Sequence, residues 1–361
     1  MIGGPVLIAA GGTGGHVFPA LAVARALRER GVAVVWLGAV GGMEARLVPA
    51  NGFPMECVRV AGIRGKGMGA WLLAPARLGR AVVESIGVMR RRRPRAVLGA
   101  GGFVSGPGGI AAWLLRIPLL IHEQNAVAGL TNRWLARLAR EVLEAFPGSF
   151  GPTVRARCIG NPVRAEIVAI EPPRARFAGR TGRTRVLVIG GSQGARCLNE
   201  LVPAAVARLA AALRPEIRHQ TGARGGEATR EAYARAGVDA ATSAFIDDMA
   251  AAYAWADFVI CRAGALTIAE LRAAGLGAIL VPFPSAVDDH QTRNAEVLAR
   301  AGAAVIEPES SLDADRLARS IVALAADRAR LLAMAEAARA GAVTDAAATL
   351  AQLCIAAGAA P

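Results

Sequence analysis

The chain alternates short apolar runs with longer stretches in which apolar residues recur every three or four positions. Residues 6–10 form an apolar run that ends in a glycine-rich turn at 11–15. Residues 20–29 have helical periodicity, and residues 32–37 form the next apolar run. Strands and helices that alternate in this way are typical of a parallel sheet covered by helices on both faces. The pattern therefore predicts an α/β fold.

The same order of elements returns in the second half of the chain. An apolar run at 186–189 precedes another glycine-rich turn at 190–194 and a helical run at 198–213. This approximate repeat predicts two Rossmann-like, doubly wound domains in tandem.

The boundary between these domains is expected near Pro162, which interrupts regular structure and precedes a stretch rich in Pro, Gly and Arg. We expect an N-terminal domain over 1–161 and a C-terminal domain over 162–340. Residues 311–338 have one continuous helical pattern. The segment 341–361 includes a final helix, at 346–357, whose packing partner the pattern leaves open.

Composition narrows the class of protein. Hydrophobic residues make up 54% of the 361 residues, which excludes a disordered chain. The uncharged stretches 1–24 and 97–115 are both interrupted by glycines, so neither is expected to be a signal peptide or a membrane span. The five cysteines are scattered without CxxC spacing, which predicts neither a disulfide framework nor a zinc site and indicates a reducing, cytoplasmic compartment.

Positive charge is concentrated in one segment. The formal net charge is +14, and the stretch 59–116 holds eleven basic residues against the single acid Glu84. Such a local field attracts phosphates, whether of a nucleic acid, an anionic lipid or a diphosphate substrate. A solvated helix face is the alternative explanation.

Three glycine-rich loops follow apolar runs, at 11–15, 99–109 and 190–194. Loops of this kind let backbone N–H groups and a helix N-terminus approach phosphate oxygens. None of them matches GxGxxG in full, and no acidic residue ends the second strand, so a dinucleotide fingerprint is weak. The three loops predict a phosphate-bearing ligand.

Two side chains are candidates for chemistry beside these loops. His16 follows the first glycine turn at a helix start. There it is placed to act as a general base or as a hydrogen-bond donor to a phosphate. Glu270 follows the turn after the run 258–261 and is either a first-turn carboxylate that complements the helix dipole or an acceptor for ribose hydroxyls. For His122, at a strand end, capping of backbone groups is the simpler explanation.

No metal site is expected. Asp313 and Asp315 form the one Asp-x-Asp in the chain, and helix capping explains them.

Eight motifs carry a resemblance to a known family: GGTGGHVFPALAVA, HEQN, FPGSF, GNPVR, GGSQGAR, FIDDMAAAYAWAD, CRAGALTIAE and DDHQTRNAEVL. Their order resembles that of the MurG family of N-acetylglucosaminyltransferases, from residue 6 to about 340. The resemblance implies a GT-B fold made of two Rossmann-like domains that face a cleft. It implies an inverting transfer of N-acetylglucosamine from UDP-N-acetylglucosamine to the C4 hydroxyl of lipid I, which gives lipid II for peptidoglycan, without a cofactor.

The resemblance also implies site residues. His16 is the implied base, with Glu123 in reserve. Arg164 and Ser192 would meet the diphosphate, Ile246 the uracil, Glu270 the ribose and Gln291 the sugar. The remaining donor contacts would be Thr13, Gly14, Gly15, Asn125, Ala265, Leu266, Thr267, Ile268 and Ala269.

A peripheral location at the cytoplasmic face of the cell membrane is also implied, with cell-wall synthesis and division proteins as partners. The sequence offers a surface for the anionic leaflet, because apolar and basic residues alternate there. The apolar members are 71–73, Leu78, Val82 and Trp113, and the basic members are Lys66, Arg77, Arg80 and 90–93. A core helix beside a solvated basic turn is the alternative.

Other classes of protein make different predictions. A UDP-sugar epimerase of the same fold would need similar nucleotide contacts but no lipid-facing surface. An NAD-dependent oxidoreductase would show GxGxxG and a ribose carboxylate. A basic nucleic-acid-binding protein would place aromatic residues among its arginines, and the few aromatic residues here do not group with them. We therefore expect no nucleic-acid partner.

Overall fold

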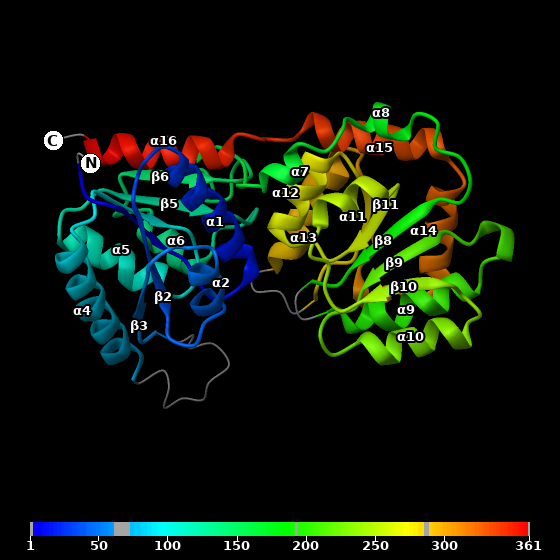
Figure 1. The fold of residues 1–361 in the computed structure, drawn as a ribbon, viewed down its shortest axis with the longest axis horizontal. Coiled ribbons are helices and arrows are strands. Elements are labelled where there is room, and N and C mark those ends of the chain that lie inside the picture. Colours follow the sequence, from blue (N-terminus) through cyan, green and yellow to red (C-terminus); the bar gives the residue numbers. More distant parts are fainter. Residues whose placement is uncertain (1–2, 61–72, 192–193, 285–288, 360–361) are drawn as a thin grey trace. The chain divides into compact units, whose positions relative to one another are not determined.

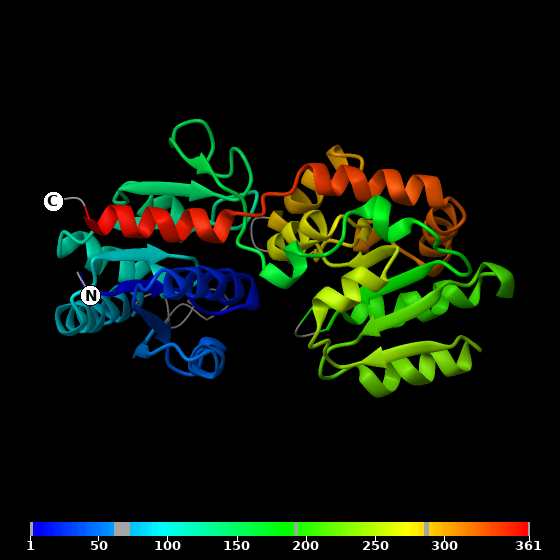
Figure 2. The ribbon, with the colours of Figure 1, turned by 45° about the horizontal axis from the view of Figure 1, so that its top comes forward.

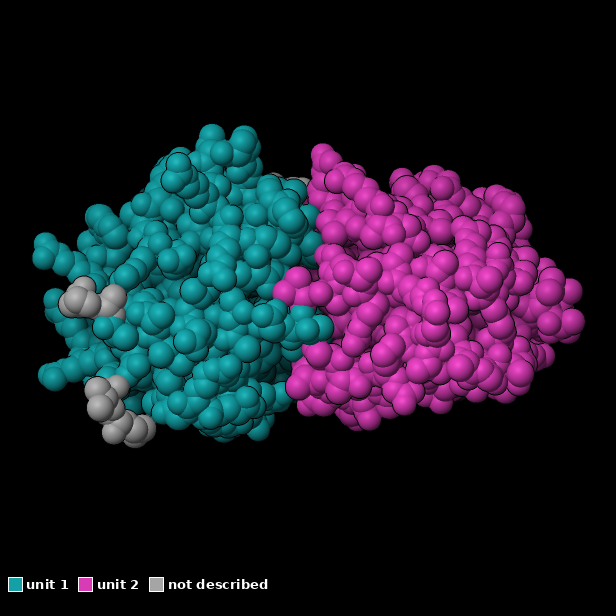
Figure 3. All heavy atoms as spheres, turned by 90° about the horizontal axis from the view of Figure 1, so that it is seen from above, with its two compact units in different colours: residues 1–163, 344–361 teal, residues 164–343 magenta. Residues whose placement is uncertain are grey.

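The computed structural model describes residues 3–60, 73–191, 194–284 and 289–359. The chain divides into two compact units (Figure 3), each with its own sheet (Figure 1). Unit 1 comprises residues 1–163 and 344–361, and unit 2 comprises residues 164–343. The division falls next to Pro162, and the C-terminal segment belongs to unit 1.

Unit 1 is built on a parallel sheet with the strand order β3-β2-β1-β4-β5-β6-β7 in the described residues. Because the order reverses between β1 and β4, the carboxyl ends of these two strands are where a doubly wound sheet binds ligands. The strands are β1 Val6–Ala9, β2 Val34–Ala39, β3 Met55–Val58, β4 Ala96–Gly99, β5 Leu119–Glu123, β6 Glu141–Glu144 and β7 Arg157–Cys158.

Alternate residues of β1 face two separate cores, which explains why the strand is apolar throughout. Val6 and Ile8 pack with α1 (Gly14–Glu29), whereas Leu7 and Ala9 pack with α4 (Ala74–Arg92) and α5 (Ser105–Leu114). The short helices α2 (Glu44–Ala50) and α6 (Leu130–Leu135) also belong to this unit.

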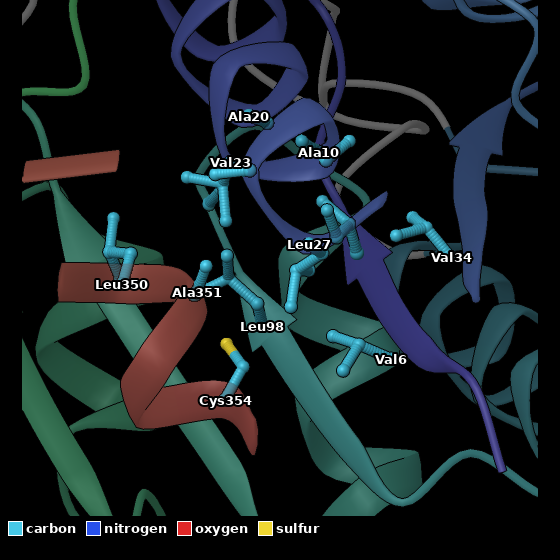
Figure 4. Packing of buried hydrophobic residues seen from close by; sticks show 14 of the residues in the cluster. Val6, Ala10, Ala20, Val23, Leu27, Val34, Leu98, Leu350, Ala351 and Cys354 are labelled. Carbon is cyan, nitrogen blue, oxygen red and sulfur yellow. The ribbon is translucent and has the colours of Figure 1, made fainter. Parts of the chain in front are cut away.

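The final helix, α16 (Ala346–Ala359), packs on unit 1 (Figure 2). Its apolar side chains Leu350, Ala351 and Cys354 are buried against α1 and β4, next to Leu98 (Figure 4). The packing partner that the sequence left open is therefore the first sheet.

Unit 2 repeats the arrangement with the strand order β10-β9-β8-β11-β12-β13 among its described residues. Its switch point lies between β8 and β11. The strands are β8 Arg185–Ile189, β9 Glu216–Gln220, β10 Ala240–Ser243, β11 Phe258–Cys261, β12 Gly277–Leu280 and β13 Ala304–Ile306. The helices are α7 Ala165–Val168, α8 Pro173–Phe177, α9 Arg196–Ala207, α10 Gly226–Arg235, α11 Met249–Trp255, α12 Ala265–Ala274, α13 His290–Arg300, α14 Ala314–Ala325 and α15 Arg328–Ala340, with 3-10 turns at Ala211–Leu213 and Glu309–Ser311.

The single helix expected over 311–338 is wrong, because the structure has α14 and α15 there. Asp327 separates them: its carboxylate accepts the backbone N–H of Arg330 at 2.9 Å and caps α15. Asp313 caps α14 in the same way through the N–H of Arg316, which confirms the capping interpretation of this aspartate. An N-cap inside an apolar periodic run leaves the periodicity nearly intact, so the pattern alone does not show the break.

Candidate active site

The first two glycine loops meet at the switch point of unit 1. Gly101 lies against the His16 ring so closely that a Cβ there would overlap the imidazole. Gly102, with φ of +81°, passes over the carbonyl oxygen of Gly11, where a side chain has no room. Ser105 joins the two loops, since its Oγ lies 2.8 Å from the carbonyl oxygens of both Ala9 and Gly101. The loops therefore hold His16 in one place.

His16 stands in the first turn of α1, as the sequence predicts. The N-cap of this helix is Thr13, whose Oγ1 lies 3.2 Å from Nδ1 of His16. The ring is half-buried, and Gly14 and Gly15 are the first two residues of the same helix. A half-buried imidazole at the start of a helix is a candidate acceptor for the proton of a substrate hydroxyl.

Glu44 holds the first glycine loop through a hydrogen bond from its backbone, a role that the sequence did not predict. Its buried carboxylate accepts the N–H of Gly12 at 3.1 Å and that of Ala39 at 2.9 Å. No ion pair to Glu44 occurs among the residues that the structure describes. In the sequence Glu44 resembles an ordinary first-turn acid of α2, so no local signal marks this role.

Glu123, the reserve base, is buried at the end of β5, and both its oxygens are occupied. Oε1 accepts from the backbone N–H and the side-chain amide of Asn125, at 2.9 and 3.1 Å. Oε2 accepts from the N–H of Gly129 at 3.1 Å and from Nδ2 of Asn132 at 2.9 Å. Because Glu123 accepts four hydrogen bonds, a role in fixing the loop that carries Asn125 is favoured over a role as the base that accepts a substrate proton.

His122 bonds to the backbone, as expected for a histidine at a strand end. Its Nε2 donates to the carbonyl oxygen of Gly160 at 2.9 Å, and Gln124 donates to its Nδ1 at 3.3 Å. Burial lowers the pKa of His122 to about 4, so the ring is neutral at pH 7.

The corresponding site of unit 2 lies around Glu270, which is 6% exposed. Its Oε1 is 2.9 Å from Nη2 of Arg164, and its Oε2 accepts the hydroxyl of Tyr253 at 3.1 Å. Burial raises the pKa of this carboxyl, and the Arg164 guanidinium acts in the opposite direction. The first-turn interpretation is wrong, because Glu270 is the sixth residue of α12 and points to Arg164 and Tyr253.

The other predicted donor residues of unit 2 lie on loops and helix starts at the carboxyl edge of the sheet. Residues 265–269 form the first turns of α12 after Gly264, where backbone N–H groups and the helix dipole favour an anion. Ile268 is fully buried in the core, so it can offer a ligand only its backbone. Ile246 is half-buried in the loop after β10.

Gln291 is the second residue of α13, and its Oε1 accepts the N–H of Phe283 at 3.0 Å. Ser192 lies outside the described residues.

Among the described residues, no group of three or more His, Cys, Asp or Glu side chains is arranged to hold a metal ion.

The buried histidines predict acid sensitivity. Burial lowers the pKa of both His122 and His219 to about 4, whereas an unfolded histidine titrates near 6.5. The unfolded chain therefore takes up protons between pH 6.5 and 4 that the folded chain does not. Above pH 6.5 the free energy of unfolding is not reduced by these histidines. As pH approaches 4 it falls by on the order of 3 kcal/mol for each of them.

Hydrogen exchange at pH 7.5 and 4.5 measures this loss in each unit separately. His219→Gln is expected to reduce the acid sensitivity of β8 and β9 in unit 2 and to leave that of unit 1, which contains His122, unchanged. Equal acid sensitivity of unit 2 in both proteins would contradict the assignment.

Two family models match the chain. The glycosyltransferase family 28 N-terminal domain matches residues 6–144, and the family 28 C-terminal domain matches residues 185–350. Together with the two Rossmann-like sheets, they define a glycosyltransferase of the GT-B fold. The fold class predicted from the sequence is thus confirmed.

Curated relatives give the particular family. UDP-N-acetylglucosamine--N-acetylmuramyl-(pentapeptide) pyrophosphoryl-undecaprenol N-acetylglucosamine transferases from Marinobacter nauticus and Alkalilimnicola ehrlichii are 57% and 58% identical to this chain. Each alignment covers 97% of this chain, and 96% and 98% of the respective relatives. The crystal structure of Acinetobacter baumannii MurG is 40% identical, with a TM-score of 0.85 over 98% of this chain and 99% of that one. The chain belongs to the MurG family of N-acetylglucosaminyltransferases.

A more distant structure shows the fold alone. The calicheamicin glycosyltransferase CalG4 is 16% identical with a TM-score of 0.71, over the full length of both chains. The matches confirm the resemblance read from the eight motifs and do not favour the epimerase, oxidoreductase or nucleic-acid-binding interpretations.

Proposed function

We propose that this protein transfers N-acetylglucosamine from UDP-N-acetylglucosamine to the C4 hydroxyl of the N-acetylmuramic acid in lipid I, with inversion and release of UDP. The observation that carries the proposal is the near-full-length identity of 57–58% to relatives named for this reaction. The local geometry supports it, because each unit has a glycine-rich loop and candidate site residues at the switch point of its sheet, where doubly wound sheets bind ligands.

In this proposal the acceptor hydroxyl loses its proton to His16. The oxygen attacks the anomeric carbon, the bond from that carbon to the diphosphate oxygen breaks, and UDP leaves. Negative charge that develops on the diphosphate is stabilised by the N-terminus of α12, by amides of the third glycine loop and by Arg164. Thr13, Gly14, Gly15 and Asn125 complete the donor contacts as predictions from the family motifs.

Arg164 and Glu270 neutralise each other in the structure, although the proposal gives them different parts of the donor. Ribose hydroxyls that donate to Glu270 and a diphosphate that accepts from Arg164 supply each side chain with a new partner. The ion pair thus keeps two partly desolvated charges compensated until the nucleotide binds.

The test of the proposed function is UDP release from UDP-N-acetylglucosamine, measured with and without a lipid I analogue. Release that depends on the analogue, with the disaccharide product identified by mass spectrometry, is expected. Formation of UDP-N-acetylmannosamine without an acceptor would instead indicate an epimerase.

We extend the proposal to peripheral binding at the cytoplasmic face of the membrane, where lipid I presents its diphosphate. No helix of the described residues is long and apolar enough to cross a bilayer. Val83 on α4 is 67% exposed and Trp113 at the end of α5 is 52% exposed. Leu73, Leu78 and Leu114 are also exposed, whereas Val82 is half-buried. Residues 61–72, which include Lys66 and Trp71, lie outside the described part of the chain.

Partnership with cell-wall synthesis and division proteins belongs to the same proposal and rests on the family resemblance.

Some arginines of α4 form salt bridges with acidic residues, and the unpaired ones are the better candidates for contact with anionic lipids. Arg91 and Arg92 pair with Glu56, and Arg80 pairs with Glu84. Arg77 and Arg90 are exposed and make no ion pair within the described residues. Arg90 stands two turns after Val83, on the same outward face of α4.

The double variant Arg77→Ser/Arg90→Ser is expected to bind anionic vesicles about 30-fold more weakly at low salt, from about 1 kcal/mol for each charge. Vesicle co-sedimentation measures the loss. Activity on a soluble short-chain acceptor should stay at the wild-type level. Arg196→Ser, which removes an exposed arginine of α9 that pairs with Glu200 in unit 2, controls for the loss of a surface charge elsewhere. Unchanged vesicle binding by the double variant would contradict the assignment of this surface.

A further inference from the structure

The structure places a buried glutamine between two loops of the nucleotide site in unit 2. Gln220 is the last residue of β9, in register with Ile189 of β8 on one side and with Ser243 of β10 on the other. Its side chain is 4% exposed. The third glycine loop continues directly from β8, and the loop that carries Ile246 continues from β10.

The Gln220 amide bonds to both of these loops. Its Oε1 accepts the N–H of Gly191 at 3.1 Å, and its Nε2 donates to the carbonyl oxygens of Gly191 at 3.0 Å and of Ala244 at 2.8 Å. One acceptor and two donors are thus matched to three backbone groups. A side chain of the same length without this set of groups cannot make the three bonds.

The glycine loop needs this support because its backbone is unusual. Gly191 has φ of +82° and Gly194 has φ of +77°, in the left-handed region. Gly194 also passes so close to the carbonyl oxygen of Thr221, the residue after Gln220, that a Cβ would collide with it. The end of β9 therefore contacts the loop at two points, through the Gln220 side chain and through the Thr221 backbone.

We propose that Gln220 is a positioning residue for the donor nucleotide, which fixes the spacing between the loop for the diphosphate and the loop for the uracil. The inference rests on the proposed function, which assigns these two loops to the two ends of UDP. A ligand that spans both loops binds more tightly when the loops are already at the correct distance. The loops then lose less conformational entropy on binding.

Two substitutions of similar size test the role. Gln220→Met fills the same space without polar groups, and Gln220→Glu keeps an acceptor but loses both donors when ionised. We expect each to raise the Kd for UDP and the KM for the donor about tenfold at pH 8, with kcat within twofold of wild type. Protonation of the new carboxyl restores one donor, so the UDP affinity of Gln220→Glu should recover as pH falls to 5.5, while that of Gln220→Met should not.

Thr184→Val is the matched control. Thr184 is a buried residue next to the opposite end of β8, and its hydroxyl donates to the carbonyl oxygen of Ala325 at 2.9 Å. This variant is expected to unfold at lower urea concentration and to bind UDP like the wild type. Isothermal titration with UDP, circular dichroism and steady-state kinetics are measured for all four proteins.

The outcomes separate the inference from the proposed function. Wild-type protein that neither binds UDP nor consumes UDP-N-acetylglucosamine would overturn the proposed function. If the wild type is active, the inference fails in any of three cases: the Gln220 variants bind UDP normally, Gln220→Glu shows no pH-dependent recovery beyond that of Gln220→Met, or Thr184→Val loses as much affinity as they do.

Discussion

Replacing His16 by alanine is expected to lower kcat by about 10²-fold or more, the effect of removing a general base, while the Kd for UDP changes little. The imidazole is held by Thr13 and by the backbone of Gly101, so its position depends on two loops that meet at the switch point of the first sheet. Single-turnover kinetics with a lipid I analogue separate the chemical step from product release, and titration calorimetry gives the UDP affinity.

Two further measurements identify the base. Added imidazole should restore part of the activity of His16→Ala, because it can occupy the space that the side chain leaves. Glu123→Gln is expected to lower thermal stability, since Glu123 accepts four hydrogen bonds around Asn125. Wild-type turnover in His16→Ala together with a loss of two orders of magnitude in well-folded Glu123→Gln would transfer the role to the carboxylate.

Replacing Glu270 by alanine is expected to weaken UDP binding by about 2–3 kcal/mol, which corresponds to roughly 30- to 150-fold. The change removes a charged acceptor for the ribose and leaves Arg164 and the hydroxyl of Tyr253 without their partner. The specific readout is discrimination between UDP and its 2′-deoxyribose analogue, which should largely disappear in the variant.

Asp257→Asn is the control for losing a buried carboxylate elsewhere in unit 2. Asp257 pairs with Arg180 at the start of β11, at the opposite edge of the sheet from α12. This control should be less stable but should keep the wild-type discrimination. If Glu270→Ala still distinguishes the two nucleotides as the wild type does, Glu270 does not bind the ribose.

The sequence allowed the fold and the location of the sites to be predicted because both depend on local signals. Apolar runs that end in glycine turns mark parallel strands and their carboxyl ends, where loops converge in any doubly wound sheet. His16 directly follows such a turn, and Glu270 lies in the helix that begins after another, so their positions near the sheet edges were predictable. Their roles remain predictions.

Contacts between distant segments could not be predicted in this way. Arg164 meets Glu270 across 106 residues, and Glu44 meets Gly12 across 32. Gln220 is the terminal residue of a strand, and nothing in its neighbours along the chain indicates that its amide fits Gly191. These bonds depend on strand order and register, which the hydrophobic pattern does not encode. The break at Asp327 was missed because a cap leaves the periodicity intact.

The return of α16 to unit 1 has a consequence for biosynthesis. Residues 164–343 form unit 2 as one continuous stretch, whereas unit 1 needs α16 to cover the sheet face that includes Leu98. At about 5–20 residues per second, roughly 10–40 s pass on the ribosome between completion of the first part of unit 1 and emergence of its last helix. During this interval the apolar sheet face that includes Leu98 lacks the cover of α16, so unit 1 cannot complete its core until this helix has been synthesised.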